Sequence, residues 1–372
     1  MCRFCIYFAP SRPIALAELI TRPSHSIIRQ SYQCEERLTS HGMPASLNAD
    51  GFGIGWYVEE KKAAETIDTV SVNAAETTRL AIMEPEVFAK AVRKQDEQSA
   101  RTPCVFTSTL PAWNNRNLFR LAEKVVSPLF FAHVRAASST ASITESNCHP
   151  FNFGAYLFQH NGMVCNFARM KRQILAVLPD QVFDSLSGTT DSEHAFALFL
   201  AQLKDCTGLT EGGRLTPLQL FAAVRRVVRY LQKLHRSLSP EPSGSLLNFA
   251  VSDGRSLVVT RFADTPDDKA QAASMYFSVG AAFERDRCSF IQHTEYRMTQ
   301  DARVEDVCIV SSERLTGAPN DWTEVPTNHA IVVTGKHEGT IDWLLMPLPY
   351  DGTEDADLSH VGMSPLTEPR IF

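Results

Sequence analysis

Short apolar runs bounded by Pro, Gly and polar residues recur along most of the chain and predict strands. The first run, at residues 2–8, ends before Pro10 and Pro13, and a short apolar helix is predicted over 13–20. The second, at 50–58, has glycine at alternate positions, which removes side chains from one face of a strand. The remaining runs that we interpret as strands are 104–109, 129–136, 155–160, 246–252, 256–261, 275–280, 304–310, 330–334 and 340–346.

Two segments have the periodicity of helices. Residues 191–204 are apolar on most sides, which predicts a buried helix, and residues 216–236 repeat apolar positions at amphipathic spacing. Pro217 suits the first turn of the second helix, and residues 238–244 resemble a linker loop. Because strands and helices come in blocks, the expected fold class is α+β with mainly antiparallel sheets.

The composition divides the chain into one large domain and two peripheral segments. Residues 59–102 are rich in Ala, Glu, Lys, Arg and Gln, which predicts a surface insertion with one helix near 84–94. Residues 348–372 are rich in Asp, Glu, Pro and Ser, which is typical of a loose tail. The single domain is therefore expected to span 2–347.

Composition and charge exclude several classes of protein. Of the 372 residues, 44% are hydrophobic and 21% are charged, as in an ordinary soluble enzyme. A net charge of −6 gives no reason to expect nucleic acid or an acidic membrane surface as a partner. The chain shows neither a signal peptide nor an apolar run of roughly 18 residues, and its nine cysteines are scattered. We therefore expect a cytoplasmic protein.

Cys2 is the first candidate for chemistry. Removal of Met1 would leave a thiol and a free α-amino group on one residue, with ordinary pKa values of about 8.5 and about 7.7–8.0. The amine can then accept the thiol proton near neutral pH, so that one residue supplies nucleophile and base. Alternatively, position 2 has no special role, or Cys2 and Cys5 form a CxxC pair. In a strand the two would point to opposite faces, and no second CxxC completes a zinc site.

Four further segments follow Cys2 in a characteristic order. They are Phe131–Ala136, Asn147–Phe151, His160–Gly162 and Gly188–Glu193. Together with Cys2 they resemble the motifs of the glutaminase domain in class II glutamine amidotransferases. That family cleaves the γ-amide of glutamine through a γ-glutamyl thioester. The resemblance implies the four-layer αββα sandwich of N-terminal-nucleophile hydrolases and requires neither a metal nor an organic cofactor.

The resemblance also assigns roles to individual residues. Arg135 offers a planar fork for the α-carboxylate of a γ-glutamyl substrate, and Asp191 supplies the charge opposite its α-ammonium group. Asn161 and the backbone N–H of Gly162 match the oxyanion hole. Each of these residue types also has an ordinary structural explanation: Asn-Gly forms tight turns, arginines at strand ends are usually solvated, and Asp191 would suit a helix N-cap.

Two more positions belong to the implied substrate site. Ser138 can offer a hydroxyl group to the substrate carboxylate, and His149 lies in a matching motif, although before Pro150 it could only shape a turn. The biosynthetic members of the family continue the arginine motif with Trp, Ala, Thr and His, where this chain has residues 136–139, Ala-Ala-Ser-Ser. The loss of the Trp and His equivalents argues against an ammonia channel of that design.

Further segments resemble one branch of the family, the amidotransferase-type subunit of the fungal cytosolic glutathione-degradation complex. The resemblance implies glutathione or a related γ-glutamyl compound as substrate and a peptidase-like protein subunit as partner. A related branch hydrolyses a γ-glutamyl intermediate of ergothioneine synthesis. The segments are Thr21–Ser26, Asp50–Gly53, Ala112–Asn115, Asn147–Phe151, Leu246–Ala250 and Trp322–Pro326.

Two other functions stay open at this point. The chain could be a glutaminase subunit that supplies ammonia to a separate synthase, although no synthase domain is visible in it. It could also be a non-catalytic partner subunit that retains the fold, although the intact motif residues argue against loss of activity. The basic polar side of the helix at 216–236 fits a solvated face or a docking surface.

Overall fold

A computed structural model gives the structure of the chain. It describes residues 1–36, 47–58, 102–137, 142–207, 215–241, 243–265, 272–286, 295–301, 304–336 and 339–348. Nearly all of the predicted insertion, including its helix, lies outside the described residues, as do Ser138 and the tail from residue 349 onward.

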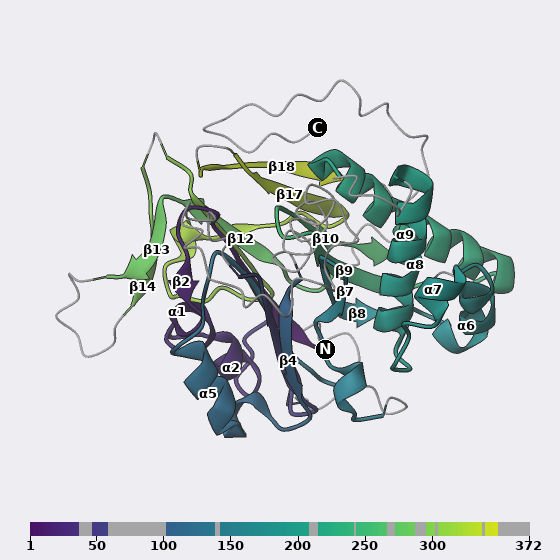
Figure 1. The fold of residues 1–372 in the computed structure, drawn as a ribbon, viewed down its shortest axis with the longest axis horizontal. Coiled ribbons are helices and arrows are strands. Elements are labelled where there is room, and N and C mark those ends of the chain that lie inside the picture. Colours follow the sequence, from purple (N-terminus) through teal and green to yellow (C-terminus); the bar gives the residue numbers. More distant parts are fainter. Residues whose placement is uncertain are drawn as a thin grey trace, which may run out of the picture.

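Two large antiparallel sheets form the centre of the molecule (Figure 1). The first has the order β16-β12-β15-β1-β6-β3-β4, so that the N-terminal strand lies in its middle. Its strands are β1 (Arg3–Phe8), β3 (Phe52–Trp56), β4 (Cys104–Ser108), β6 (Leu129–Val134), β12 (Tyr276–Gly280), β15 (Val307–Ser311) and β16 (Thr323–Glu324).

The second sheet has the order β18-β17-β10-β9-β8-β7, and β11 pairs with β9. Its strands are β7 (Phe151–Phe153), β8 (Tyr156–Met163), β9 (Ser245–Ser252), β10 (Ser256–Arg261), β11 (Ala263–Asp264), β17 (His329–Gly335) and β18 (Ile341–Pro347). Two small ribbons lie outside the large sheets, namely β2 (Ile14–Ala15) with β5 (Val126–Ser127) and β13 (Ala282–Arg285) with β14 (Tyr296–Thr299).

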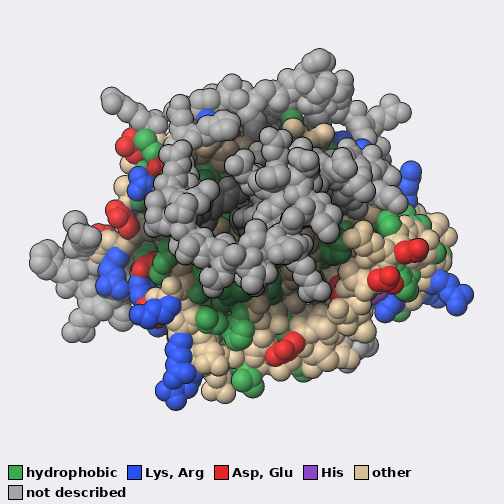
Figure 2. Space-filling model, viewed as in Figure 1, with side chains coloured by type: hydrophobic (Ala, Val, Ile, Leu, Met, Phe, Trp, Pro, Cys, Tyr) green, Lys and Arg blue, Asp and Glu red, His purple; other side chains and the backbone are tan. Residues whose placement is uncertain are grey.

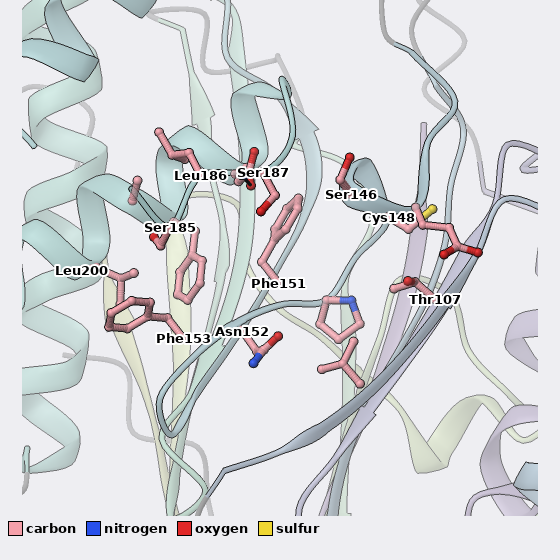
Figure 3. Close-up of a pocket in the computed structure, with 16 residues that line it drawn as sticks. Thr107, Ser146, Cys148, Phe151, Asn152, Phe153, Ser185, Leu186, Ser187 and Leu200 are labelled. Atoms are coloured by element: carbon pink, nitrogen blue, oxygen red, sulfur yellow. Dashed lines mark hydrogen bonds between the residues drawn. The ribbon is translucent and has the colours of Figure 1, made fainter. Parts of the chain in front are cut away.

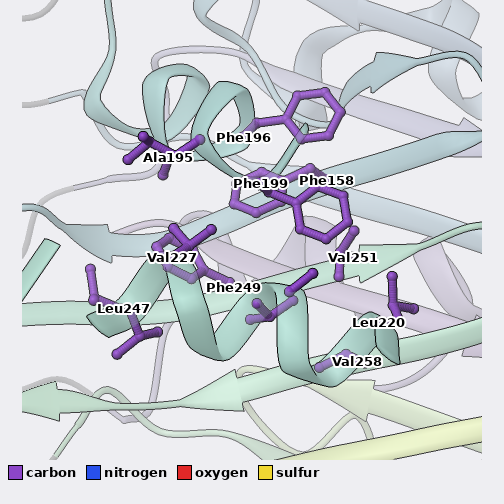
Figure 4. Packing of buried hydrophobic residues seen from close by; sticks show 14 of the residues in the cluster. Phe158, Ala195, Phe196, Phe199, Leu220, Val227, Leu247, Phe249, Val251 and Val258 are labelled. Atoms are coloured by element: carbon purple, nitrogen blue, oxygen red, sulfur yellow. The ribbon is translucent and has the colours of Figure 1, made fainter. Parts of the chain in front are cut away.

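Helices cover the outer face of each sheet. One layer covers the second sheet and packs on it through aromatic residues such as Phe158, Phe196 and Phe199 (Figure 4). Its helices are α6 (Phe167–Ala176), α7 (Asp180–Phe183), α8 (Asp191–Thr207) and α9 (Pro217–Leu238). The other layer covers the first sheet with α1 (Ala17–Ile20), α2 (Ile27–Gln30) and α5 (Arg116–Ala122), and short 3₁₀ helices lie at Ala112–Asn114, Glu145–Asn147 and Pro319–Asp321. The predicted αββα sandwich is confirmed.

The alternation of side chains along β1 explains the stacking of the sheets. Phe4, Ile6 and Phe8 point into the apolar layer between the two sheets, while Cys5 and Tyr7 point to the outer helical layer. Both faces of β1 are therefore buried, which is why its sequence is an almost continuous apolar run.

The longest predicted elements agree with the structure. The buried helix at 191–204 is α8, and the amphipathic helix at 216–236 is α9, whose N-cap Thr216 forms a capping box with Gln219. The helix predicted at 13–20 is wrong in its first part, because residues 14–15 pair with β5 and only Ala17–Ile20 is helical. A strand of only two residues, such as β2, is too short to show a hydrophobic periodicity in the sequence.

The face of the molecule shown in Figure 2 carries Lys and Arg side chains among Asp and Glu side chains along its rim. Among the described residues on that face, no broad patch of one charge is visible. Within the part of the chain that the structure describes, no helix combines the length and apolar character needed to cross a membrane.

Candidate functional site

Cys2 lies at the end of β1, beside the end of β6. The register pairs Arg3 with Val134, which places Cys2 next to Arg135 and Ala136. The backbone N–H of Ala136 donates to the Cys2 Sγ at 3.4 Å, and the carbonyl oxygen of Ala136 lies 3.6 Å from the same sulfur. Burial raises the pKa of the Cys2 thiol, although the Ala136 N–H and the positive charges of the chain terminus, Arg135 and Arg3 oppose that rise. The thiol therefore needs a base to become a nucleophile.

Arg135 is held in place by its backbone and by one end of its guanidinium group. Its N–H donates to the Gly51 carbonyl at 2.8 Å, and its carbonyl accepts from the Asp50 N–H at 3.1 Å. The side chain is 3% exposed, and Nη2 donates to the Ser142 carbonyl at 3.0 Å. Nη1 is buried and has no partner among the described residues. A buried cationic donor without a partner is suited to bind the carboxylate of a ligand.

Asn161 and Gly162 lie near the end of β8, where β8 pairs with β9. The Asn161 side chain is fully buried, and its Nδ2 donates to the Ser312 Oγ at 3.3 Å. A Cβ atom at Gly162 would lie 1.8 Å from the Leu246 carbonyl oxygen, so only glycine fits this position. The Asn-Gly pair therefore lies inside a strand, where packing requires the glycine, and does not form a tight turn.

Asp191 is the first residue of α8 and contacts the segment that follows β8. Its Oδ2 accepts from the Val164 N–H at 2.7 Å, and its Oδ1 accepts from the Ser192 N–H at 2.9 Å. Thr190, and not Asp191, has the position of the N-cap, because its Oγ1 accepts from the Glu193 N–H at 3.2 Å. These contacts hold the partly exposed Asp191 carboxylate against the backbone of Val164, which follows Gly162 by two residues in the sequence.

His149 is positioned by the glycines of β3. A Cβ atom at Gly53 would lie 2.0 Å from the His149 carbonyl oxygen, and one at Gly55 would lie 2.7 Å from the Pro150 Cγ. The segment from Cys148 to Pro150, which includes a cis peptide bond before the proline, therefore packs directly on the bare face of β3. Glycine at alternate positions of this strand is what permits the close approach.

Three buried histidines lie near the same ends of the strands. The rings of His133 and His149 are 4.2 Å apart, and the His133 Nε2 contacts the His160 carbonyl at 3.2 Å. Burial lowers the pKa of His133 to about 3 and lowers the pKa of His149 well below its ordinary value. Burial also lowers the pKa of His160, although Asp191 opposes that change. The lowered pKa values make all three rings weaker bases than an ordinary histidine.

The structure places several of the residues that the sequence predicts for the site at the ends of neighbouring strands. The pairing of β1 with β6 joins Cys2 to Arg135, Ser312 links Asn161 to the first sheet, and Val164 links Asp191 to β8. His149 lies in the layer between the sheets, and Ser138 is outside the described residues.

Sequence reasoning missed the residues that support the site. Asn147 accepts from the Thr189 N–H at 2.8 Å and donates to the Ser142 carbonyl at 3.0 Å, so it connects the segment that holds Arg135 to the start of α8. Ser312 was missed as well. Only the position of Asn147 within a family motif could have indicated its role, and Ser312 follows a strand with no signal of its own.

A separate pocket of about 200 Å³ lies between β4, β7 and α8 (Figure 3). Phe153 and Leu200 lie on one side of it, and Thr107 and Cys148 lie on the other. Cys2, Arg135 and Asn161 do not line it, so this pocket is not where the predicted chemistry takes place. Within the described ranges, no three His, Cys, Asp or Glu side chains gather in an arrangement that could hold a metal ion.

Comparison with known proteins identifies a matching family and two relatives of this chain. Residues 96–348 match the family of class II glutamine amidotransferases. The chain is 38% identical over 339 residues to the probable glutamine amidotransferase DUG3 of Saccharomyces cerevisiae, a match that covers 90% of this chain and 82% of the yeast protein. It is 26% identical over 219 residues to the γ-glutamyl-hercynylcysteine sulfoxide hydrolase of Mycolicibacterium smegmatis, covering 58% of this chain and 71% of the relative.

A solved structure has the same fold. A glutamine aminotransferase class-II domain protein from Silicibacter pomeroyi superimposes with a TM-score of 0.51 at 20% sequence identity, covering 93% of this chain and 99% of that one. The family match, the yeast relative and the arrangement of the motif residues agree. The chain belongs to the class II glutamine amidotransferases.

Proposed function

We propose that this protein hydrolyses γ-glutamyl amide bonds with Cys2 as its nucleophile. One observation carries the proposal most directly. The Cys2 Sγ lies 3.4 Å from the backbone nitrogen of Ala136, and the preceding residue, Arg135, keeps a buried guanidinium nitrogen without a partner. A thiol nucleophile and an anion-binding group are thus adjacent, as cleavage of a substrate that carries its own carboxylate requires.

The reaction begins once Met1 is removed. The α-amino group of Cys2 takes the thiol proton, and the sulfur attacks the γ-carbonyl carbon of the substrate. Asn161 and the Gly162 N–H stabilise the oxyanion that forms. The protonated amine then gives its proton to the leaving nitrogen as the C–N bond breaks, which leaves a γ-glutamyl thioester. The weakly basic neighbouring histidines support this choice of base.

Water completes the cycle. The same α-amine takes a proton from a water molecule, the water oxygen bonds to the thioester carbon, and the C–S bond breaks. The thiolate recovers the proton and glutamate leaves. Arg135 and Asp191 bind the α-carboxylate and the α-ammonium group throughout, and Ser138 and His149 complete the substrate site in this proposal.

The substrate that we propose is glutathione or a related γ-glutamyl compound. The motifs that resemble the subunit of the fungal glutathione-degradation complex support this choice, and so does the small side chain of Ala136 beside Cys2, where biosynthetic amidotransferases carry Trp. A leaving group as large as Cys-Gly needs an open cleft near Cys2, lined in part by residues 135–139, His149 and Asn161–Gly162. The relative named as a γ-glutamyl-hercynylcysteine sulfoxide hydrolase supports the broader class of substrate.

A peptidase-like protein partner and a cytoplasmic location belong to the same proposal. The test is glutamate release by the purified protein from glutathione, glutamine and other γ-glutamyl amides, with and without a peptidase-like partner. Cys2→Ala serves as the matched inactive control. We expect kcat/KM for glutathione to exceed that for glutamine in at least one partner condition. If glutamine is preferred under every condition, a glutaminase that supplies ammonia replaces this proposal, and if no substrate is cleaved, the protein is a non-catalytic subunit.

A further inference from the structure

Ser312 follows β15 directly and is fully buried between the two sheets. Its backbone N–H donates to the Phe4 carbonyl at 2.9 Å, which continues the pairing of β15 with β1. Its hydroxyl oxygen accepts from the Phe4 N–H at 3.0 Å and from the Asn161 Nδ2 at 3.3 Å. One hydroxyl group therefore connects the strand that carries the nucleophile with the strand that carries the oxyanion donor.

The hydrogen bond from Asn161 to Ser312 is important because the Asn161 amide is otherwise held by few polar groups. Among the described residues, Ser312 is the hydrogen-bond partner of this side chain, and the Asn161 Oδ1 is buried without a partner. Nδ2 carries two hydrogens, and Ser312 occupies one of them, so the other is free to donate to an oxyanion. Without Ser312 the amide would have no hydrogen-bond partner among the described residues to fix its rotation about the last side-chain bond.

We propose that Ser312 is a positioning residue for the reaction, because its hydroxyl holds the Asn161 amide with one N–H directed at the oxygen of the tetrahedral intermediate. This inference rests on the proposed function. A donor that is fixed before the reaction stabilises the oxyanion without having to reorient as charge develops. Because the same hydroxyl binds Phe4, two residues after Cys2, it also sets the oxyanion donor at a fixed place relative to the nucleophile.

The neighbouring serine provides a matched control. Ser311 is also fully buried, but it lies within β15, where it pairs with Cys5 and Tyr276, and its Oγ has no partner among the described residues. Ser311→Ala removes the same atom from the next position without touching Asn161. We expect it to leave kcat and KM within about twofold of the wild type.

The kinetic experiment is a double-mutant cycle with Asn161. Ser312→Ala should lower kcat for γ-glutamyl hydrolysis by about tenfold, the loss expected from one hydrogen bond, with KM changed less than about twofold. Ser312→Thr keeps the hydroxyl and should restore most of the rate. In the Asn161→Ala background, the same Ser312→Ala change should cost less than about twofold, because its target is already absent.

Two kinetic outcomes overturn the inference. One is an unchanged kcat in Ser312→Ala. The other is an equal loss in both backgrounds, which would show that Ser312 acts through Phe4 and the position of β1 and not through Asn161. If Ser312→Ala does not fold, Ser312→Cys fills the same space with a poor acceptor and gives the same comparison.

A second measurement does not depend on activity. In protein labelled with ¹⁵N at asparagine, the side-chain amide signals of Asn161 are identified by their loss in Asn161→Ala. They should shift in Ser312→Ala and stay in place in Ser311→Ala. Unshifted signals overturn the inference whether or not the enzyme turns over. If the signals shift but the wild type cleaves no γ-glutamyl amide, the proposed function fails while the Ser312–Asn161 contact stands.

Discussion

Arg3 and Glu313 form an ion pair on the opposite side of the first sheet from Asn161, with 2.7 Å between the Arg3 Nε and the Glu313 Oε1. Their side chains are only 2% and 1% exposed. Arg3 also donates to the Cys2 carbonyl at 2.9 Å, and Glu313 accepts from the His25 ring at 2.7 Å and from the Glu35 N–H at 2.9 Å. Arg3, which follows the proposed nucleophile Cys2, is thereby tied to Glu313, which follows Ser312.

Breaking this pair should destabilise the protein strongly. Glu313→Gln leaves the charge of Arg3 buried without a countercharge, and we expect the free energy of unfolding to fall by about 3–5 kcal/mol. The surface pair between Lys336 and Asp342, with the same 2.7 Å separation but side chains 32% and 13% exposed, is the matched control. Asp342→Asn should cost less than about 1 kcal/mol. Urea unfolding of both variants measures the difference, and equal losses would contradict the assigned importance of burial.

The Glu313 carboxylate should also make the free energy of unfolding depend on pH in the acid range. Burial alone would raise the pKa of Glu313, but the hydrogen bond from His25, the charge of Arg3 and the Glu35 N–H together lower it from its ordinary 4.5 to about 2. A lowered folded-state pKa means that the stabilisation is complete above about pH 4.5 and is lost as the pH falls toward 2. Unfolding measured at several pH values should therefore show a steeper acid loss in the wild type than in Glu313→Gln, and parallel curves would show that Glu313 does not contribute.

Activity should require the loss of Met1. While Met1 is present, the nitrogen of Cys2 is an amide and cannot act as a base. Met1 is 37% exposed, so its removal needs no unfolding of the sheet. Intact-mass measurement should show that the active protein begins at Cys2. A fully active preparation that retains Met1 would contradict the proposed mechanism.

Arg135→Lys should weaken substrate binding more than chemistry. The guanidinium group can contact the Ser142 carbonyl with one nitrogen and a substrate carboxylate with another, whereas a lysine offers a single point charge. We expect KM to rise at least about tenfold with a smaller change in kcat. Arg297→Lys is the control, because Arg297 forms an ion pair with Asp321 and its side chain is 47% exposed. An unchanged KM would mean that Arg135 does not bind the substrate carboxylate.

Most of the fold could be predicted because its strands are either buried on both faces or regularly alternating. β1, β6 and β10 are uniformly buried, and their apolar runs mark them clearly. Apart from the ten-residue helix α6, the elements that were missed are short or depend on distant partners. β16 has two exposed residues and exists only through its pairing with β12, and α2 has four residues whose sequence carries no helical repeat long enough to recognise.

The sequence indicates candidate chemical groups for the site but not the residues that support them. Cys2, Arg135, Asn161 and Asp191 are proposed for the site because their motifs occur in a recognisable order. Ser312 could not be found, because its role depends on a contact 151 residues away in sequence and on the stacking of two sheets. Residue type and local spacing contain no information about such a contact.

The central position of β1 has a consequence for how the chain is made. β1 is synthesised before both of its neighbours in the sheet. One of them, β15, follows much later in the chain, since 308 residues separate Phe4 from Ser312. At an elongation rate of about 5–20 residues per second, that edge of β1 stays without its partner for roughly 15–60 s. During this time Cys2, which precedes β1, lacks the neighbours that complete the proposed site. If the proposed site is correct, the nascent chain stays inactive until β15 and Ser312 have emerged, and in this interval its apolar first strand is open to wrong pairing or to capture by a chaperone.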